Sequence, residues 1–145
     1  QVAASEILQL DETGIPSGIK MNITGTQFDF QSPRVLRQGD SPLNIDHNYC
    51  VSHDRARLRP IAWLSGGDTQ MELASTEPGL QVYTGAQLGA DLSSAPTGRA
   101  FHPYAGIALE PQIWPDSPNQ PEFAQAILHP GDEYHHQIEY RFARD

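Results

Sequence analysis

Residues 105–124 read AGIALEPQIWPDSPNQPEFA, and this stretch carries the pattern that decides the fold. Apolar residues occupy every second position from 105 to 109, as in a β-strand with two different faces, and Glu110 ends the alternate row. Pro111 follows and biases Glu110 towards an extended backbone. Three further prolines then punctuate a polar loop around Trp114. The stretch therefore predicts a strand that ends at Glu110 and opens into a turn-rich loop.

Glu110 is the residue of this stretch that best suits chemistry. A carboxylate at the end of a strand, facing a loop with an aromatic ring, suits a catalytic base or a group that binds sugar hydroxyls. The same position suits a solvated residue at the edge of a sheet. The pattern alone leaves both interpretations open.

The same alternation of short apolar runs and turn residues extends along the chain. No segment of ten or more residues keeps a 3.6-residue period, and 12 glycines and 12 prolines supply many turns. We expect strands at residues 6–10, 19–23, 35–36, 61–64, 70–73, 80–84, 105–110 and 133–141, and a long loop with a mobile tip over residues 85–104. Short strands between turns predict an all-β fold, an antiparallel β-sandwich, formed as one domain by residues 1–145.

The charge of the chain excludes several classes of partner. Its 145 residues include 18 acidic and 9 basic residues, and the net charge is −9 at neutral pH. No lysine or arginine cluster provides the positive surface that nucleic acid or an anionic membrane needs. Arg55, Arg57 and Arg59 alternate, and we expect them to form one solvated strand face. We expect a neutral polar substrate, no nucleic acid and no membrane.

Cys50 is the single cysteine, so the chain forms no disulfide within itself. A lone thiol without a framework of bridges favours a cytoplasmic protein. No apolar run approaches the roughly 20 residues that a membrane-spanning helix needs.

Six histidines invite a metal hypothesis. His47, Cys50 and His53 stand three positions apart, but positions three apart on a strand point to opposite faces. A zinc site needs ligands that converge, so we expect no bound metal. Signatures of P-loops, dinucleotide sites, metalloproteases and GxSxG hydrolases are missing, although a Ser/His/Asp triad of distant residues stays open.

Glu110, Asp46, His47, Gln81 and Trp114 remain as side chains suited to a neutral polyol. Carboxylate and amide groups hold vicinal hydroxyls, and an aromatic ring offers an apolar face to a sugar. Asp46 and His47 equally suit a pair that caps a loop, and Trp114 suits an anchor for the core or for a lid. The residues alone leave these interpretations open.

Six segments resemble, in the same order, motifs of the aldose 1-epimerases, also called galactose mutarotases. They are DETGIPSG at 11–18, GTQFDFQSP at 25–33, IDHNY at 45–49, EPGLQVYTG at 77–85, LEPQIWPDSPNQPEF at 109–123 and LHPGDEY at 128–134. Each segment alone is moderately specific, and their common order makes the resemblance strong over nearly the whole chain.

This resemblance implies the C-terminal part of a galactose mutarotase-like supersandwich, which is a large β-sandwich. It implies an isomerase that interconverts the α and β anomers of aldohexoses such as galactose or glucose by acid and base catalysis, with no cofactor. The family's catalytic base falls on Glu110, and its substrate-binding aspartate and glutamine fall on Asp46 and Gln81. The implied partner is therefore a small-molecule aldohexose.

The chain also departs from the family pattern. Pro111 replaces the usual threonine, and Ile45 stands where an aromatic residue is common. The family's general-acid histidine and other residues that hold the sugar belong to an N-terminal portion that has no counterpart here, and none of the six histidines aligns with that acid. We therefore expect a C-terminal segment of a longer mutarotase, inactive or nearly so by itself, with the missing N-terminal portion as a partner.

Two other functions stay open. A carbohydrate-binding module would use the same pocket without chemistry, and the missing acid favours this function for the chain alone. A hexose-phosphate epimerase would need cationic groups for the phosphate, which the net charge of −9 disfavours.

Overall fold

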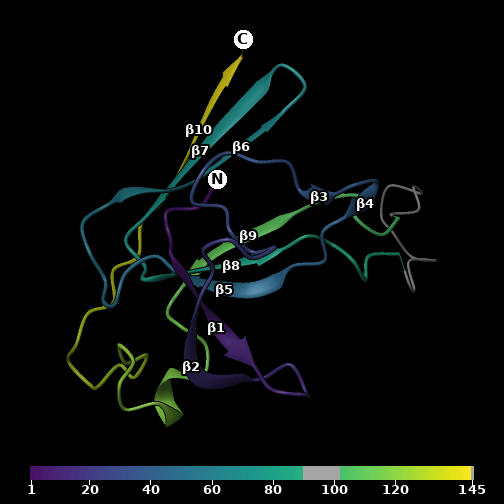
Figure 1. Cartoon of the computed structure of the whole chain (residues 1–145). Coiled ribbons are helices and arrows are strands. Elements are labelled where there is room, and N and C mark those ends of the chain that lie inside the picture. The colour runs from purple at the N-terminus through teal and green to yellow at the C-terminus, as the bar shows by residue number, and fades with distance from the viewer. Residues whose placement is uncertain (90–101, 145) are drawn as a thin grey trace.

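The structure, a computed structural model, describes residues 1–89 and 102–144, and within them ten strands form three antiparallel sheets (Figure 1). The five-stranded sheet has the order β2 (Pro16–Asn22), β1 (Glu6–Leu10), β5 (Asp46–Cys50), β8 (Gly79–Tyr83), β9 (Ala108–Gln112). The three-stranded sheet has the order β10 (Ile138–Arg144), β7 (Thr69–Ser75), β6 (Arg59–Gly66), and β3 (Arg37–Gln38) pairs with β4 (Ser41–Pro42). The helical content of the described residues is one 3₁₀ turn, η1 (Ser117–Asn119). The prediction of an all-β, antiparallel fold is confirmed.

The main core lies between the five-stranded and three-stranded sheets. Alternation along each strand turns one row of apolar side chains inwards, and these rows meet in a single buried cluster. Its fully buried members on strands are Ile7, Tyr49, Leu80, Ile61 and Leu73. The Tyr49 hydroxyl donates a hydrogen bond of 3.0 Å to the Phe28 carbonyl oxygen, so its polar end is satisfied. The two sheets therefore form a sandwich, from which the hairpin of β6 and β7 projects with β10 beside it (Figure 1).

A second, smaller cluster lies on the other face of the five-stranded sheet. Leu8 of β1 packs there against Trp114 and Phe123, and the two aromatic rings meet edge to face with centroids 4.9 Å apart. Trp114 is 3% exposed, and its indole nitrogen donates to the Pro78 carbonyl oxygen over 3.0 Å. The loop after β9 is therefore anchored across this face, and it leaves the remainder of the face open.

Several expected strand limits are corrected by the structure. β9 does not end at Glu110 but continues through Pro111, which pairs with Leu80. β9 pairs with β8 alone among the described strands, and an edge strand tolerates a proline because its outward N–H has no partner to lose. Residues 35–36 are not a strand, since the short strand begins at Arg37.

The last strand begins later than the expected residue 133. Gln137 exchanges hydrogen bonds with Thr76: its N–H donates to the Thr76 hydroxyl over 3.1 Å, and the Thr76 N–H donates to its carbonyl over 3.2 Å. Before this point His136 lies 3.3 Å from the Ser75 hydroxyl, and the ladder with β7 starts at Ile138. The expected loop over residues 85–104 has its middle, residues 90–101, outside the described residues.

The expected solvated strand face of Arg55, Arg57 and Arg59 is wrong, because Arg55 and Arg57 precede β6 and Arg55 pairs with a buried carboxylate. Glu77 is 0% exposed, and its Oε1 accepts from Nε of Arg55 over 2.9 Å. Arg59 donates to the carbonyl oxygens of Ser75 and Glu77 over 3.0 and 3.2 Å. A buried carboxylate needs such a cation, and Glu77 lies too far along the sequence for local spacing to reveal it.

Within the described residues, no helix is long and apolar enough to cross a bilayer.

Candidate functional site

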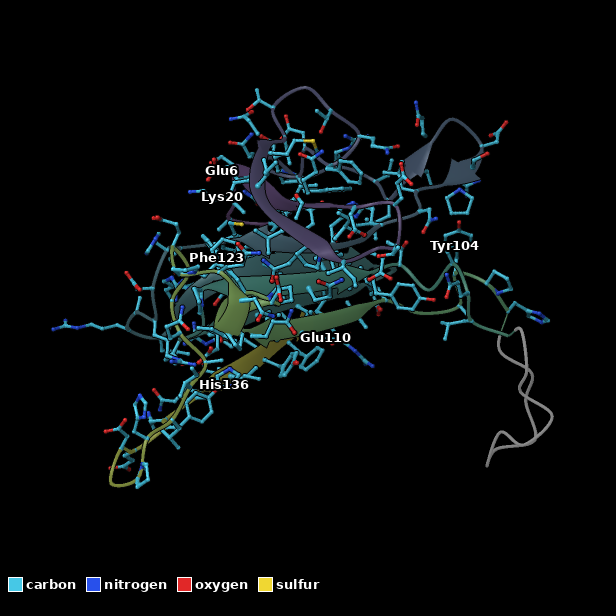
Figure 2. All side chains as sticks on the ribbon, turned by 90° about the horizontal axis from the view of Figure 1, so that it is seen from below. Glu6, Lys20, Tyr104, Glu110, Phe123 and His136 are labelled. Atoms are coloured by element: carbon cyan, nitrogen blue, oxygen red, sulfur yellow. The ribbon has the colours of Figure 1, made fainter. Side chains whose placement is uncertain are left out.

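Three neighbouring strands place polar residues in register on the open face of the five-stranded sheet. Asn48 of β5 lies opposite Gln81 of β8, which lies opposite Glu110 of β9. Asp46 stands two residues before Asn48 and shares its face. The core lies against the other face, so alternation along the strands gives this sheet one polar face and one apolar face. Figure 2 looks towards this polar face, with Glu110 labelled on β9.

The structure brings together the three predicted site residues. Gln81 Nε2 donates a hydrogen bond of 2.7 Å to Asp46 Oδ1, so these side chains orient each other. Glu110 is exposed on the adjacent strand. All three border a hollow of about 600 Å³, a size suited to a small ligand. The hollow is completed by Leu10, Gly14, Pro16, Asn44, His47, Asn48, Tyr83, Gln112 and Pro115.

Asn48 and Gln112 are site residues that the sequence reasoning missed. Asn48 is 1% exposed at the floor of the hollow, and its Oδ1 lies 3.5 Å from Gln112 Nε2. Its Nδ2 is buried and finds no hydrogen-bond partner in the described residues. Asn48 lies two positions after Asp46 on β5, and Gln112 lies two positions after Glu110 on β9. Because side chains two apart on a strand share a face, this spacing would have identified both as residues of the site.

Gly79 shapes the floor of the hollow by the absence of a side chain. A Cβ atom at this position would lie 2.5 Å from Asn48 Oδ1 and 2.9 Å from Trp114 Cδ1. The Asn48 amide and the Trp114 ring therefore share the space above Gly79. This close approach explains why a glycine opens β8.

His47 and Trp114 do not join the predicted group. His47 lies at the margin of the hollow, but alternation along β5 turns its ring to the inner face. There the ring packs on Phe28 with centroids 4.5 Å apart, and burial lowers the pKa of His47, partly offset by the charge of Asp46. Trp114 is buried in the anchor of the loop after β9. Trp114 is therefore an anchor for the core, which is one of the interpretations that the sequence left open.

The described residues contain no group of three or more His, Cys, Asp and Glu side chains that converges as a metal site does. Cys50, which stood in the spacing considered for a metal, is half-buried, and burial raises the pKa of its thiol to about 12. The site as described is therefore a set of carboxylates and amides, which bind hydroxyl groups through hydrogen bonds.

A comparison with protein families matches residues 1–141 to the family described as aldose 1-epimerase. The chain belongs to the aldose 1-epimerase family. Galactose mutarotase from Mus musculus is 38% identical over 150 residues, which cover 98% of this chain and 42% of the relative. Aldose 1-epimerase from Escherichia coli K12 is 35% identical over 156 residues, covering 98% of this chain and 44% of the relative. The resemblance in the six motifs is confirmed.

The fold agrees with this family membership. The crystal structure of a GalM/aldose epimerase homologue from C. elegans matches with a TM-score of 0.81 at 24% identity, covering 99% of this chain and 45% of that chain. The chain thus spans less than half the length of the aldose 1-epimerase relatives that it matches.

Proposed function

We propose that this chain supplies the catalytic base and part of the sugar pocket of an aldose 1-epimerase, which interconverts the α and β anomers of aldohexoses such as galactose or glucose without a cofactor. The observation that carries the proposal is the row on the open face of β5, β8 and β9. There the exposed Glu110 stands beside Gln81, which is itself held by Asp46 at 2.7 Å.

Glu110 acts as the base in this proposal. The carboxylate form of this exposed side chain accepts the proton of the C1 hydroxyl. The electron pair left on that oxygen forms the C1 carbonyl, while the bond between C1 and the ring oxygen breaks and an acid protonates the ring oxygen. The carbonyl rotates, the ring oxygen attacks its other face and returns its proton to the acid, and Glu110 returns its proton to the new C1 hydroxyl.

Asp46 and Gln81 hold the sugar in this proposal. Asp46 Oδ1 and Gln81 Nε2 already bind each other, so Asp46 Oδ2 and Gln81 Oε1 are the acceptors that hydroxyl donors can reach. Of the described residues that line the hollow, none is a lysine or an arginine. A neutral aldohexose therefore suits the hollow better than a hexose phosphate, which would need a cation.

The general acid lies, in this proposal, in the N-terminal portion of the family that this chain does not match. His47 is the histidine of the chain nearest to the hollow, and its ring packs on Phe28 on the other face of the sheet. Residues 1–145 therefore serve as the C-terminal portion of a two-part site. We propose a cytoplasmic location as well, on the ground of the single thiol, Cys50.

The experiment that tests this division is polarimetry on freshly dissolved α-D-galactose. We expect the chain alone to relax the sugar at the buffer rate, because losing one partner of an acid and base pair removes about 10²- to 10⁴-fold of the rate. Addition of the portion of mouse galactose mutarotase that lies outside its match to this chain should restore acceleration. Acceleration by the chain alone, at a verified mass, would place the acid within residues 1–145 and contradict the proposal.

A second function, binding of carbohydrate without chemistry, is favoured by the absence of a histidine ring on the polar face of β5, β8 and β9 among the described residues. Calorimetric titration of the chain with galactose measures it directly. Measurable binding, together with a buffer rate that persists after addition of the mouse portion, would favour this second function over the epimerase.

A further inference from the structure

Glu110 has two glutamine neighbours on the open face of the five-stranded sheet. Gln112 stands two positions after it on β9, so the two side chains share a face and their Cα atoms lie about 7 Å apart. Gln81 lies opposite Glu110 on β8. Glu110 therefore has one amide neighbour along its own strand and another on the adjacent strand.

Both glutamines are held in the same way, each by a side chain of β5. Gln81 Nε2 donates to Asp46 Oδ1 over 2.7 Å. Gln112 Nε2 donates to Asn48 Oδ1 over 3.5 Å, a long contact that leaves the Gln112 amide room to adjust to a ligand. Each pairing uses one amide hydrogen of the glutamine and leaves its Oε1 outside the pair.

Gly79 provides the path for the second pair. It lies on β8 opposite Gln112, and a Cβ atom there would lie 2.5 Å from Asn48 Oδ1. The Asn48 side chain therefore crosses β8 above this glycine to reach Gln112 on β9. Any larger residue at position 79 would block the crossing.

Asn48 also has a buried donor that the pair does not use. Its side chain is 1% exposed, and its Nδ2 finds no hydrogen-bond partner of adequate geometry among the described residues. Burial raises the pKa of the nearby Cys50 thiol, and the Asn48 side chain opposes this rise only slightly, so the sulfur is at most a weak acceptor for the amide. A buried donor without a strong acceptor costs stability, so we look for its purpose in the hollow above it rather than in the core.

Amides suit this part of the hollow better than further charged groups. Asp46 and Glu110 already bring two carboxylates to the face, and none of the described residues that line the hollow is a lysine or an arginine. A third carboxylate would repel both. An amide binds hydroxyl groups through hydrogen bonds without adding charge.

We propose that Gln112 is a further sugar-binding residue and that Asn48 is the positioning residue that holds its amide beside Glu110, roles that rest on the proposed function because the ligand is the same aldohexose. Glu110 and Gln112 border one hollow, so a sugar with its C1 hydroxyl at Glu110 lies within reach of both. Gln112 Oε1 accepts from a hydroxyl of that sugar, and its second amide hydrogen donates to a sugar oxygen. The contact to Asn48 fixes the direction in which the amide faces the ligand.

The test titrates isotopically labelled residues 1–145 with D-galactose and follows the side-chain NH₂ signals by NMR. Substitution of each glutamine by alanine assigns its signal. Gln31 is exposed and lies outside the hollow, so it is the matched control. We expect the signals of Gln112 and Gln81 to shift with one common dissociation constant, and that of Gln31 to stay in place.

The variants test the two roles separately. Gln112→Ala should weaken galactose binding about three- to tenfold, the loss expected for one neutral hydrogen bond, whereas Gln31→Ala leaves it unchanged. Asn48→Ala should reduce the response of the Gln112 signal to galactose and leave the response of the Gln81 signal intact. A loss of both responses in Asn48→Ala would show a general effect on the sheet and would overturn the positioning role, as would a Gln112 response equal to that of the wild type.

The titration of the wild-type chain needs no variant to fold, and it separates this inference from the proposed function. A saturable shift at Gln81 without one at Gln112 would overturn the new sugar contact and leave the proposed function in place. No shift at either glutamine, up to the solubility limit of galactose, would show that residues 1–145 hold no sugar, which rejects both.

Discussion

Glu77 shows how a single residue connects three parts of the chain. Its carboxylate accepts from Arg55 at 2.9 Å and from the Tyr134 hydroxyl at 3.3 Å, and it precedes the strand that carries Gln81. The guanidinium of Arg55 also lies over the Tyr134 ring, 4.8 Å from its centroid. The ion pair therefore ties the segment before β6 and the segment before β10 to the start of β8.

We predict that Glu77→Gln destabilises the fold, because it leaves the Arg55 cation without its buried partner. Removing one member of a fully buried pair costs about 3–5 kcal/mol, and solvent at Arg55, whose side chain is 36% exposed, reduces this to about 2 kcal/mol. Urea unfolding measures the loss, with Glu122→Gln in an exposed loop as the control. An unchanged unfolding free energy would show that the pair is not a structural tie.

Gly79 makes a second prediction at the residue scale. Gly79→Ala places a Cβ 2.9 Å from the Gln112 carbonyl oxygen and 2.5 Å from Asn48 Oδ1, so we expect a loss of about 1–3 kcal/mol and weaker galactose binding. Gly66→Ala is the control, since a Cβ there meets no atom within 4 Å. Unfolding and titration calorimetry measure the two effects. Equal stability of the two variants would contradict the close packing of the floor.

The candidate site was only partly predictable at this scale. Glu110 was singled out by its place at the end of a strand-like run, and the family motifs assigned roles to it and to Asp46 and Gln81. Their spacing along the chain does not show that the three meet. His47 and Trp114 were grouped with them by residue type, and the strand period and the loop anchor place them elsewhere. Residue type indicates possible chemistry, but the face of a strand decides whether a side chain takes part.

At the scale of single elements, β5 ends in a thiol that tertiary packing shields. Cys50 packs against the cluster of Leu8, Trp114 and Phe123, and burial raises its pKa from about 9 to about 12. Between these values the unfolded chain loses the thiol proton while the folded chain keeps it, so this group lowers stability as the pH rises. We predict that labelling of Cys50 at pH 8 is at least roughly 100-fold slower than in urea. Equal rates would contradict the burial.

The turns between strands carry carboxylates that accept local hydrogen bonds. The pKa of Asp11 is lowered chiefly by the hydroxyl of Thr13, that of Asp29 chiefly by the N–H of Gly25, and that of Asp116 chiefly by the side chain of Asn119. A lowered folded-state pKa gives stability that is present above about pH 4 and is lost as the pH falls through the folded value.

We therefore predict that the urea midpoint stays level between pH 7 and pH 5 and falls below about pH 4. Asp11→Asn should lower the urea midpoint at pH 7. The midpoint of this variant should then fall less between pH 5 and acid pH, because the variant lacks the stabilisation that the charged Asp11 contributes. Circular dichroism at each pH measures both changes. A midpoint that rises as the pH falls would contradict the sign.

Strand limits were less predictable than strand existence. The alternating pattern predicted the strand 6–10 correctly. The limit near Pro111 depends on β9 lying at the edge of its sheet, and the limit near Ile138 depends on the Thr76 hydroxyl, which accepts the backbone N–H of Gln137. Both limits depend on tertiary contacts, which the sequence of one segment does not show.

At the scale of the whole molecule, the five-stranded sheet separates two surfaces. One face carries the carboxylate and amide site, and the other carries the core and an apolar groove that Phe142 of β10 also lines. The all-β class was predictable from the turn-punctuated sequence. The uncovered row of Ile138, Tyr140 and Phe142 was not, because those residues alternate in the sequence as ordinary core residues do.

The measurement that tests the central claim most directly compares the wild-type chain with Glu110→Gln, each mixed with the portion of mouse galactose mutarotase outside the match. Polarimetry on α-D-galactose follows the rate, at equal occupancy of the sugar site. Glutamine keeps the shape of the side chain, but one carboxylate oxygen is replaced by an NH2 donor, so the side chain does not accept the C1 proton. We predict a rate lower by about 10²- to 10⁴-fold with galactose affinity nearly unchanged. A Glu110→Gln protein that interconverts the anomers at the wild-type rate would show that Glu110 is not the base.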